Sequence, residues 1–327
     1  MRSLSLEAPA KLNLGLRIVG LRDDGYHLLE SLFVPVALSD VVTLDFDPGG
    51  APGVQLALEG ASPDIPTEGS NLAVAAAHAF FEAWPGGALR IGLDKRIPSA
   101  AGLGGGSSDA GAVLRGLARL APQAPSVEDL VSLARGLGAD VPFFLDPRPA
   151  LVRGVGDVIE PVAGLPPLWA LLANPRIAVS TKEVFRLYDS LGSQQVADVG
   201  QVPGALPAGL TPPDPGSTMR PLSGLGGDVD VLARLPGPTN DLEAAAVRLC
   251  PPVARLRDRM RELGAVVAGM SGSGATIYGL FGSQSDAEEA FEKAGFEAPT
   301  WSRVTRVLIE PQTASADDET NERGPGA

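Results

Sequence analysis

The strongest chemical signal in the sequence is the glycine-rich stretch PSAAGLGGGSSD, which runs from Pro98 to Asp109. Glycines at 102, 104, 105 and 106 allow positive φ angles and a close approach of the backbone to a ligand. Apolar residues at 110, 113, 114, 117 and 118 predict an amphipathic helix directly afterwards, with Ser107 or Ser108 as its cap. Such a loop presents free N–H groups and the positive end of a helix dipole, which indicates a phosphate site.

Two known phosphate-loop patterns do not describe this stretch. No Gly-Lys-Ser or Gly-Lys-Thr follows, so it is not a Walker A loop, and Ser107 stands where G-x-G-x-x-G requires its third glycine. The alternative is a flexible or tightly packed loop without a ligand. Four glycines within 102–106, followed by a capped helix, favour the phosphate site.

Two charged residues elsewhere, Lys11 and Asp140, are of types that can take part in catalysis. Lys11 and Asn13 are two residues apart in an alternating stretch, so both project from one face of a predicted strand. Their spacing alone favours the solvated face of an edge strand. Asp140, in GADVPFF, stands at the exit of a predicted helix, where it could be a general base, although the residues alone favour the cap of a turn.

Three further segments have the chemistry of ligand contacts. Tyr26 and His27 follow the turn signal Asp-Asp-Gly and could stack on a planar base, although a lone histidine is more often structural. Phe185 lies on a helix opened by the capping pattern STKE and is ordinarily a core residue. GMSGSG at 269–274 lies between two predicted strands and is either a tight hairpin or a loop against a phosphate.

The elements that position these residues follow from hydrophobic periodicity and from cap and turn signals. Strands are predicted at 4–8, 12–18, 28–36, 41–46, 54–58, 90–93, 168–173 and 304–309, with two more within 265–281. Besides the helix after the glycine-rich stretch, helices are predicted at 71–84, 126–138, 180–191, 240–250, 253–263 and 285–294. The Pro- and Gly-rich stretch 192–238 is predicted to be a long loop or insertion, and the tail at 312–327 to be disordered.

Composition limits the classes of partner. The 327 residues include 26 Lys and Arg against 39 Asp and Glu, a formal net charge of −13. This argues against binding to nucleic acid or a membrane surface, but not against a small anionic ligand. The single cysteine, Cys250, excludes an intramolecular disulfide and a multi-cysteine metal site, which fits a reducing compartment. The sequence shows neither a signal peptide nor an apolar run that would span a bilayer, so we expect a cytoplasmic protein.

Seven segments together resemble the GHMP kinase superfamily, in the family's order. They are APAKLNLGL (8–16), DDGYHLLES (23–31), KRIPSAAGLGGGSSDA (95–110), GADVPFFL (138–145), STKEVF (180–185), PTNDLE (238–243) and GMSGSGATIYGLF (269–281). The resemblance implies a two-lobed α+β fold, with a β-rich N-terminal lobe at 1–160 and a ferredoxin-like C-terminal lobe at 161–311. It implies an active site in the cleft between the lobes.

The same resemblance implies an ATP-dependent kinase that acts on an alcohol group of a small molecule. Within the family, the segments look most like the branch that phosphorylates the 2-hydroxyl of 4-diphosphocytidyl-2-C-methyl-D-erythritol, in the non-mevalonate route to isoprenoid precursors. A monomer or weak homodimer is expected, with ATP and Mg²⁺ as the small-molecule requirements.

Carried over residue by residue, the resemblance implies that Asp140 is the catalytic base. Lys11 would keep Asp140 ionised and stabilise the charge that develops during phosphoryl transfer. The ATP phosphates would be bound by Pro98, Ser99, Ala100, Ala101, Gly102, Leu103, Gly104, Gly105, Gly106, Ser107 and Ser108. Ser107 or Ser108 would also meet Mg²⁺. The implied acceptor contacts are Asn13, an aromatic clamp around cytosine made by Tyr26, His27 and Phe185, a contact from Thr181, and the turn Gly272-Ser273-Gly274 at the diphosphate.

Three other functions are considered. One is a kinase of the same superfamily that acts on homoserine, mevalonate or a sugar. These acceptors contain no base on which Tyr26, His27 and Phe185 could stack. A catalytically silent nucleotide-binding regulator has no need of Lys11 and Asp140. An oxidoreductase built on the glycine-rich loop requires an acidic residue on a following βαβ strand, and the sequence shows no such unit.

Overall fold

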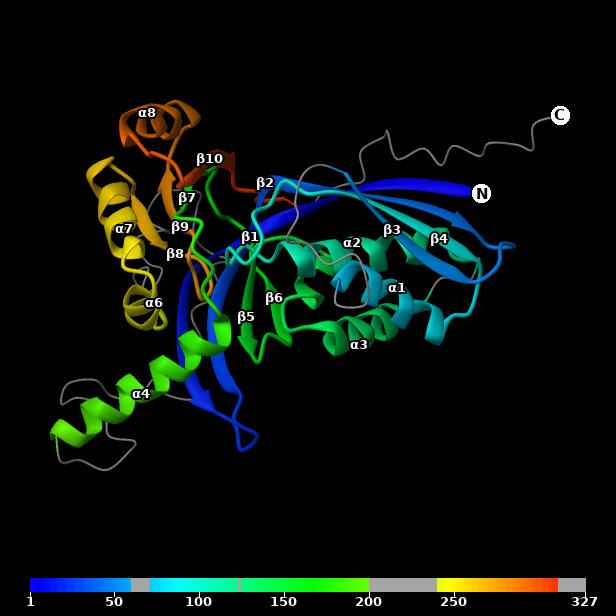
Figure 1. Ribbon diagram of the computed structural model, residues 1–327, viewed down its shortest axis with the longest axis horizontal. Helices are drawn as coiled ribbons and strands as arrows, with labels where there is room; N and C mark the ends of the chain where they lie inside the picture. Colours follow the sequence, from blue (N-terminus) through cyan, green and yellow to red (C-terminus); the bar gives the residue numbers. More distant parts are fainter. Residues whose placement is uncertain (60–70, 123–124, 200–239, 311–327) are drawn as a thin grey trace. The chain divides into compact units, whose positions relative to one another are not determined.

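The computed structural model describes residues 1–59, 71–122, 125–199 and 240–310 (Figure 1). The predicted disordered tail lies outside these residues, as does the predicted insertion beyond residue 199. The chain divides into two compact units. Unit 1 contains Met1–Asn13, Ile18–Pro161 and the described residues from Thr305 onward, and unit 2 contains Leu14–Arg17 and Val162–Val304.

A six-stranded sheet forms the frame of unit 1. Its order is β3-β4-β2-β5-β6, with β1 paired to β2. β3 and β4 are parallel, whereas β2 is antiparallel to both β4 and β5. The strands are β1 (Arg2–Leu21), β2 (His27–Asp47), β3 (Gly53–Glu59), β4 (Ala88–Asp94), β5 (Ala150–Gly154) and β6 (Val158–Pro161).

The first two strands are longer than their sequence patterns suggest. The alternating runs at 4–8 and 12–18 form one strand, and so do the runs at 28–36 and 41–46. The alternation breaks at 8–14, where every residue is buried, because polar side chains on this face meet other polar groups of the fold. β5 and β6 were not predicted from the sequence.

Two helices pack on one face of this sheet, and a third packs against these two, as Figure 1 shows. They are α1 (Leu72–Ala83), α2 (Gly105–Leu120) and α3 (Val127–Leu137), and a short 3₁₀ helix, η1 (Pro142–Leu145), follows α3. The amphipathic period predicted for α2 is confirmed, since Leu114 and Leu117 are fully buried in the core between helices and sheet. That core also holds Leu44 and Ile91 from the strands.

The predicted cap of α2 is wrong. The helix begins at Gly105, and its N-cap is Gly104 in the left-handed region, with φ 72°. A residue with a side chain is strained at such a φ, so the turn into the helix falls on a glycine rather than on Ser107 or Ser108. Both serines therefore lie within the first turn of the helix.

Unit 2 is built on a four-stranded sheet of order β10-β7-β9-β8. The strands are β7 (Trp169–Asn174), β8 (Val267–Met270), β9 (Ile277–Phe281) and β10 (Trp301–Arg306). The helices α7 (Pro252–Glu262) and α8 (Gln284–Ala294) pack against these strands, and α6 (Glu243–Leu249) packs against α7. α4 (Thr181–Val199) continues eight residues past its predicted end at 191, into the stretch predicted to be a loop.

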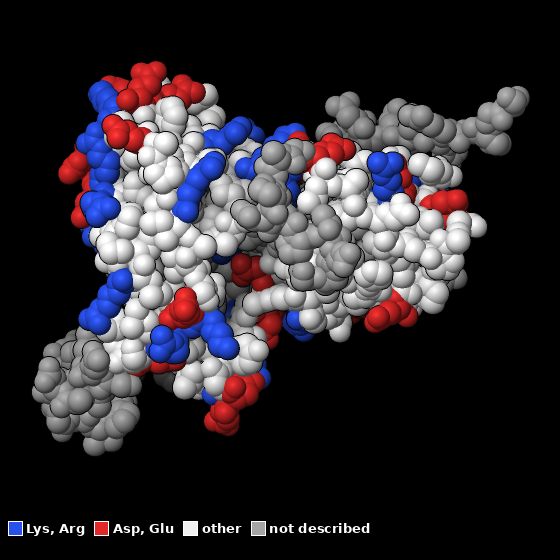
Figure 2. All heavy atoms as spheres, in the orientation of Figure 1, with Lys and Arg blue, Asp and Glu red and all other residues white. Residues whose placement is uncertain are grey.

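Two helices of unit 2 differ in the sign of the charged side chains that gather on them. In Figure 2, Lys and Arg side chains line α7, which carries four arginines in its sequence PVARLRDRMRE, and Asp and Glu gather over α8. Among the residues the structure describes, no helix is long and apolar enough to cross a membrane.

Candidate active site

Lys11 and Asn13 lie on one face of β1, as their spacing predicts, but that face is buried rather than solvated. Lys11 Nζ donates a hydrogen bond of 2.5 Å to Asn13 Oδ1, and Asn13 Nδ2 donates one of 2.9 Å to Ser31 Oγ on β2. Lys11 Nζ also lies 4.8 Å from the centroid of the Phe33 ring, within the range of a cation–π contact. A buried ammonium requires such partners, because an unpaired charge is costly away from water.

Asp140 completes an ion pair with Lys11. Its Oδ2 lies 3.5 Å from Lys11 Nζ, and its side chain remains 31% exposed while that of Lys11 is only 4% exposed. Asp140 stands in the short connection between α3 and η1, held by the hydrogen bond from Val141 N–H to the Gly138 carbonyl. The pair therefore presents a carboxylate oxygen to solvent and keeps the ammonium beneath it.

An aromatic cluster holds both members of this pair in place. Phe143 and Phe144 of η1 are buried three and four residues after Asp140, and their ring centroids are 5.1 Å apart. Phe143 packs edge-on against Phe33 of β2 at 5.3 Å. Phe33 is the same ring that contacts Lys11, so one apolar cluster positions the lysine and the aspartate.

The glycine-rich loop lies against Lys11. The Lys11 backbone N–H donates a hydrogen bond of 2.9 Å to the Leu103 carbonyl in the middle of the loop. A Cβ placed on Gly104 would lie 3.0 Å from Phe144 Cζ and 3.1 Å from Lys11 Cγ, so only glycine allows this approach. Unit 1 thus brings together three predicted features: the loop, the Lys11–Asn13 face and Asp140.

The loop ends in the helix N-terminus that the sequence predicts. No side chain caps α2, so the N–H groups of Gly105, Gly106 and Ser107 have no acceptor within the helix. Gly106 is exposed and Ser107 is half-buried. These amides and the positive end of the dipole of a 16-residue helix are suited to an anionic ligand.

Ser108 differs from Ser107 in its surroundings. Its side chain is fully buried, and its Oγ has no hydrogen-bond partner among the described residues. A hydroxyl is a hard oxygen donor of the kind that Mg²⁺ prefers. The structure shows no cluster of three His, Cys, Asp or Glu side chains suited to a metal among the residues it describes. A Mg²⁺ ion at this helix would thus take most of its ligands from phosphate oxygens and water, as is usual for this ion.

Three charged residues near the loop were missed at the sequence level. Lys95 Nζ donates hydrogen bonds to Asp40 Oδ2 and, at 2.7 Å, to Asp109 Oδ2, and all three side chains are buried. The available signal was Asp40 itself, a carboxylate within the apolar run VALSDVVTL, where an acid must find a partner. Burial raises the pKa of Asp109 to about 7, the ammonium of Lys95 opposes this, and the Asp40 carboxylate adds to it.

In unit 2, the glycine-rich turn between β8 and β9 is a hairpin connection held by two asparagines. Asn240 Nδ2 donates hydrogen bonds to the carbonyls of Met270 (2.9 Å) and Gly272 (2.7 Å). Asn174 Nδ2 donates one of 2.9 Å to Thr276 Oγ1 at the other end of the turn. Neither asparagine was predicted as a site residue, although Asn240 stands in the quoted segment PTNDLE.

Thr181 and the turn, two separately predicted substrate contacts, lie next to each other in unit 2. The hydroxyls of Thr181, at the start of α4, and Ser273 are 2.7 Å apart and share a hydrogen bond. Gly272 and Gly274 have φ values of 58° and 92°, which explains the glycines at these positions. Of the remaining predicted contacts, Tyr26 is 65% exposed in the turn before β2 and His27 begins β2, both in unit 1, and Phe185 is half-buried on α4 in unit 2.

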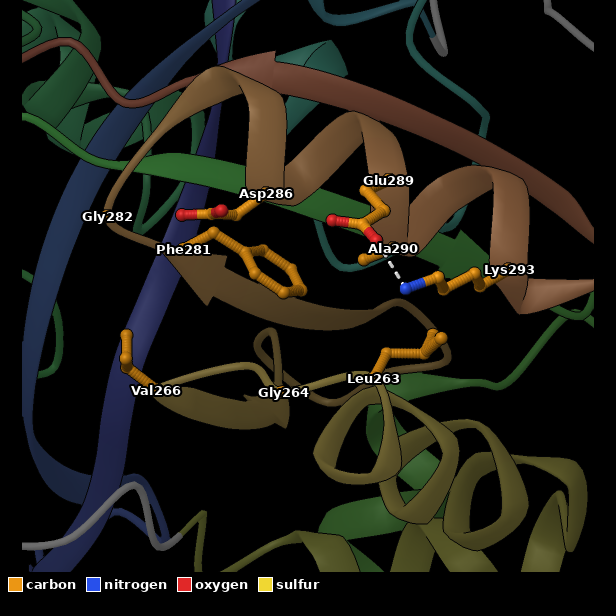
Figure 3. Close-up of a pocket in the computed structure, with 9 residues that line it drawn as sticks. All are labelled: Leu263, Gly264, Val266, Phe281, Gly282, Asp286, Glu289, Ala290 and Lys293. Carbon is orange, nitrogen blue, oxygen red and sulfur yellow. Dashed lines mark hydrogen bonds and ion pairs between the residues drawn. The ribbon is translucent and has the colours of Figure 1, made fainter.

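A surface pocket of about 230 Å³ in unit 2 shares no residue with the predicted site (Figure 3). It is formed by the end of β9, the connection after α7 and one side of α8. Its charged lining consists of Asp286, Glu289 and Lys293, and Lys293 is paired with Glu289. The acidic excess makes it unsuited to a phosphorylated ligand.

Two family models match the chain. Residues 71–146 match the GHMP kinases N terminal domain, and residues 225–299 match the GHMP kinases C terminal model. A 4-diphosphocytidyl-2-C-methyl-D-erythritol kinase from Xanthobacter autotrophicus is 42% identical over 306 residues, which cover 92% of this chain and 97% of the relative. The enzyme of the same name from Paramagnetospirillum magneticum is 39% identical over 306 residues, with 92% and 97% covered.

Solved structures give the same result for the fold. A crystal structure of a 4-(cytidine 5'-diphospho)-2C-methyl-D-erythritol kinase matches with a TM-score of 0.68 and 38% identity, covering 93% of this chain and 100% of the other. A homoserine kinase from Cytophaga hutchinsonii matches with a TM-score of 0.67 at 20% identity, covering 95% of each chain. At that identity the second likeness shows a common fold alone.

Proposed function

Since the chain belongs to the 4-diphosphocytidyl-2-C-methyl-D-erythritol kinase family of GHMP kinases, we propose that it phosphorylates the 2-hydroxyl of that substrate. The acceptor oxygen attacks the γ-phosphorus of ATP, the bond to the β-phosphate oxygen breaks, and the products are the 2-phosphate and ADP. The acceptor is a precursor in the non-mevalonate route to isoprenoids. Another GHMP kinase activity is not favoured by the relatives.

The observation that carries the catalytic assignment is the Lys11–Asp140 pair beside the glycine-rich loop. Asp140 takes the proton of the attacking hydroxyl, and its partial exposure is what a base that must meet a substrate requires. Lys11 supplies a fixed positive charge next to the reacting oxygens, where negative charge develops during transfer. Positioning and charge neutralisation are the main demands of phosphoryl transfer, and these groups meet both.

ATP phosphates are assigned to the loop from Pro98 to Ser108, where uncapped amides of α2 bind the anionic oxygens. The hydroxyl of Ser107 or Ser108 is assigned to Mg²⁺ together with the phosphates. When bound, Mg²⁺ neutralises charge on the β- and γ-phosphates. The chain itself orients the phosphate group through the backbone of the loop.

Acceptor binding is assigned to residues of both units. Asn13 orients the hydroxyl-bearing end, and its amide is itself fixed by Lys11 and Ser31. Tyr26, His27 and Phe185 clamp the cytosine ring, and Thr181 together with Gly272, Ser273 and Gly274 binds the diphosphate. We assign the N-terminal lobe to residues 1–160 and the C-terminal lobe to 161–311, and expect a cytoplasmic monomer or weak homodimer that binds no nucleic acid.

Product detection tests the reaction and the acceptor together. The purified protein is incubated with ATP, Mg²⁺ and 4-diphosphocytidyl-2-C-methyl-D-erythritol, with mevalonate, homoserine and galactose in competition, and the products are identified by mass spectrometry. A phosphorylated cytidyl product, with the other acceptors unchanged, is expected. Phosphorylation of a different acceptor would remove the cytosine clamp, and nucleotide binding without any product would favour a silent regulator.

The Asp140→Asn variant tests the assigned base. Its turnover is expected to fall by at least about 100-fold with nucleotide affinity nearly kept, because the amide cannot accept the proton. Asp146→Asn is the matched control, since Asp146 is an exposed carboxylate six residues further along that pairs with Arg148. Turnover of Asp140→Asn equal to that of the control would remove the general-base assignment.

A further inference from the structure

A buried charge cluster joins three elements of unit 1 outside the assigned catalytic residues. The cluster consists of Asp40 on β2, Lys95 directly after β4, and Asp109 in α2. The Lys95 ammonium binds one oxygen of each carboxylate, and the side chains are 8% exposed for Lys95, 0% for Asp40 and 5% for Asp109. The Lys95 ammonium, rather than solvent, is the partner of both carboxylates, so we argue their role from the elements that they join.

The first carboxylate also binds the backbone where the glycine-rich loop begins. Asp40 Oδ1 accepts hydrogen bonds from the N–H groups of Arg96 (2.5 Å) and Ile97 (2.8 Å), immediately before Pro98. One aspartate therefore holds both the side chain of Lys95 and the two backbone amides that follow it. The entrance of the loop is fixed to the central part of β2.

The other carboxylate fixes the end of the loop. Asp109 lies four residues into α2 from Gly105, so its bond to Lys95 ties the start of the helix to the loop entrance. The two ends are also in close contact, because a Cβ placed on Gly105 would lie 3.1 Å from Ile97 Cγ2 and 3.5 Å from Asp40 Oδ2. Lys95 thus acts as a bridge across the base of the loop.

We propose that Asp40, Lys95 and Asp109 are positioning residues for nucleotide binding, which hold the two ends of loop 98–104 at the separation that a phosphate group requires. This inference rests on the assignment of the loop to ATP. Apolar packing alone would let the ends slide, whereas one ammonium between two carboxylates defines a single distance and direction. A loop that is already ordered loses less conformational freedom when the nucleotide binds, so the cluster increases affinity without touching the ligand.

Nucleotide binding without turnover tests this role. The affinity for a non-hydrolysable ATP analogue with Mg²⁺ is measured by calorimetry for the wild type and for Asp109→Ala, Lys95→Met and Asp109→Asn. Asp109→Ala and Lys95→Met are expected to bind at least about tenfold more weakly, because the bridge is lost and the loop must be ordered by the ligand. Asp109→Asn is expected to stay within about threefold of the wild type, since its amide oxygen still accepts from Lys95.

The matched control is Asp45→Ala, which removes another carboxylate of β2 whose partner is Ser3 on β1, away from the loop. Steady-state kinetics add a second readout. The KM for ATP is expected to rise in Asp109→Ala while the KM for the acceptor is unchanged, a separation that general loss of stability does not produce.

Distinct results overturn the two assignments. If folded Asp109→Ala and Lys95→Met bind the analogue as well as the wild type, the positioning role is wrong while the ATP site stands. If the wild type binds no analogue, the ATP assignment is wrong and the positioning role fails with it. Should Asp109→Ala and Lys95→Met fail to fold, the same measurement is made on Asp40→Asn. Both oxygens of Asp40 accept hydrogen bonds, from Lys95 and from the amides of Arg96 and Ile97, and an asparagine has one oxygen to replace them. Wild-type affinity in Asp40→Asn would equally reject the bridge.

Discussion

Asp109 should make unit 1 less stable as the pH rises from about 4 to about 7. Burial raises the pKa of Asp109 from its ordinary value of 3.8 to about 7; Lys95 opposes this and Asp40 adds to it. The folded protein therefore keeps a proton in this window that the unfolded chain releases. The stabilising contribution of the protonated Asp109 carboxyl is fully present below its unfolded-state pKa and is lost as the pH rises through its folded-state pKa. An aspartate whose pKa is lowered by an ion pair shows the opposite dependence.

The size of the effect follows from that pKa. Each pH unit of difference between the folded and unfolded pKa corresponds to about 1.4 kcal/mol, so linkage gives a loss of roughly 2–3 kcal/mol between pH 5 and pH 8 from this carboxyl alone. Asp109→Asn carries no titrating group and keeps an acceptor for Lys95. The difference in unfolding free energy between wild type and Asp109→Asn reports the Asp109 carboxyl together with its coupling to Lys95 and Asp40, whereas titrating groups far from this cluster contribute equally to both proteins.

Urea unfolding followed by tryptophan fluorescence measures this difference. With Trp169 and Trp301 replaced by Phe in all proteins, the remaining Trp84, which follows α1, reports on unit 1. Relative to Asp109→Asn, the protein with Asp109 is expected to lose roughly 2–3 kcal/mol on going from pH 5 to pH 8. A difference that is flat or that rises with pH would refute the argument that burial dominates at Asp109.

Three further predictions concern the assigned site. Lys11→Met should lower turnover by at least about 100-fold with nucleotide affinity nearly kept, and a large loss of nucleotide affinity instead would place Lys11 at the phosphates. His27→Ala should raise the KM for the acceptor more than it lowers kcat, and an unchanged acceptor KM would remove His27 from the clamp. Asn240→Ala should cost about 1–3 kcal/mol, because it leaves the carbonyls of Met270 and Gly272 unpaired, and should raise the acceptor KM. Asn240→Asp keeps the bond from Leu242 N–H but not the two donors, so it should behave like Asn240→Ala in the same kinetic assay.

The side on which a residue lies could be predicted from the sequence, whereas its burial could not. A period of two places Lys11 and Asn13 on one face of β1, and the structure confirms this. The same period cannot show that the face is covered, because the cover comes from Phe33, Ser31 and Asp140, which are distant in sequence. Spacing alone therefore favoured the interpretation of a solvated edge, and tertiary contacts exclude it.

Local signals also failed where the backbone takes an unusual conformation. The cap of α2 was predicted from residue type, since serine is a good N-cap, but the chain enters the helix through a positive φ that Gly104 allows. Ser126 and Ser180, by contrast, accept hydrogen bonds from Asp129 N–H and Glu183 N–H, as their capping patterns predict. The rule holds where ordinary extended backbone precedes the helix and fails where glycines set the turn.

Two lysine–aspartate arrangements lie beside the same loop, and exposure separates their roles. In the Lys11–Asp140 pair the carboxylate is 31% exposed and the ions are 3.5 Å apart, so an oxygen remains available to a ligand. In the cluster of Lys95 with Asp40 and Asp109, all three side chains are buried, and the oxygens of Asp40 are fully engaged by Lys95, Arg96 and Ile97. A base must be able to receive a proton from a substrate, whereas a carboxylate that orders a loop is most effective when no solvent competes for it. The same two residue types therefore serve chemistry in one place and geometry in the other, and substitutions at the first should reduce kcat while substitutions at the second should weaken nucleotide binding.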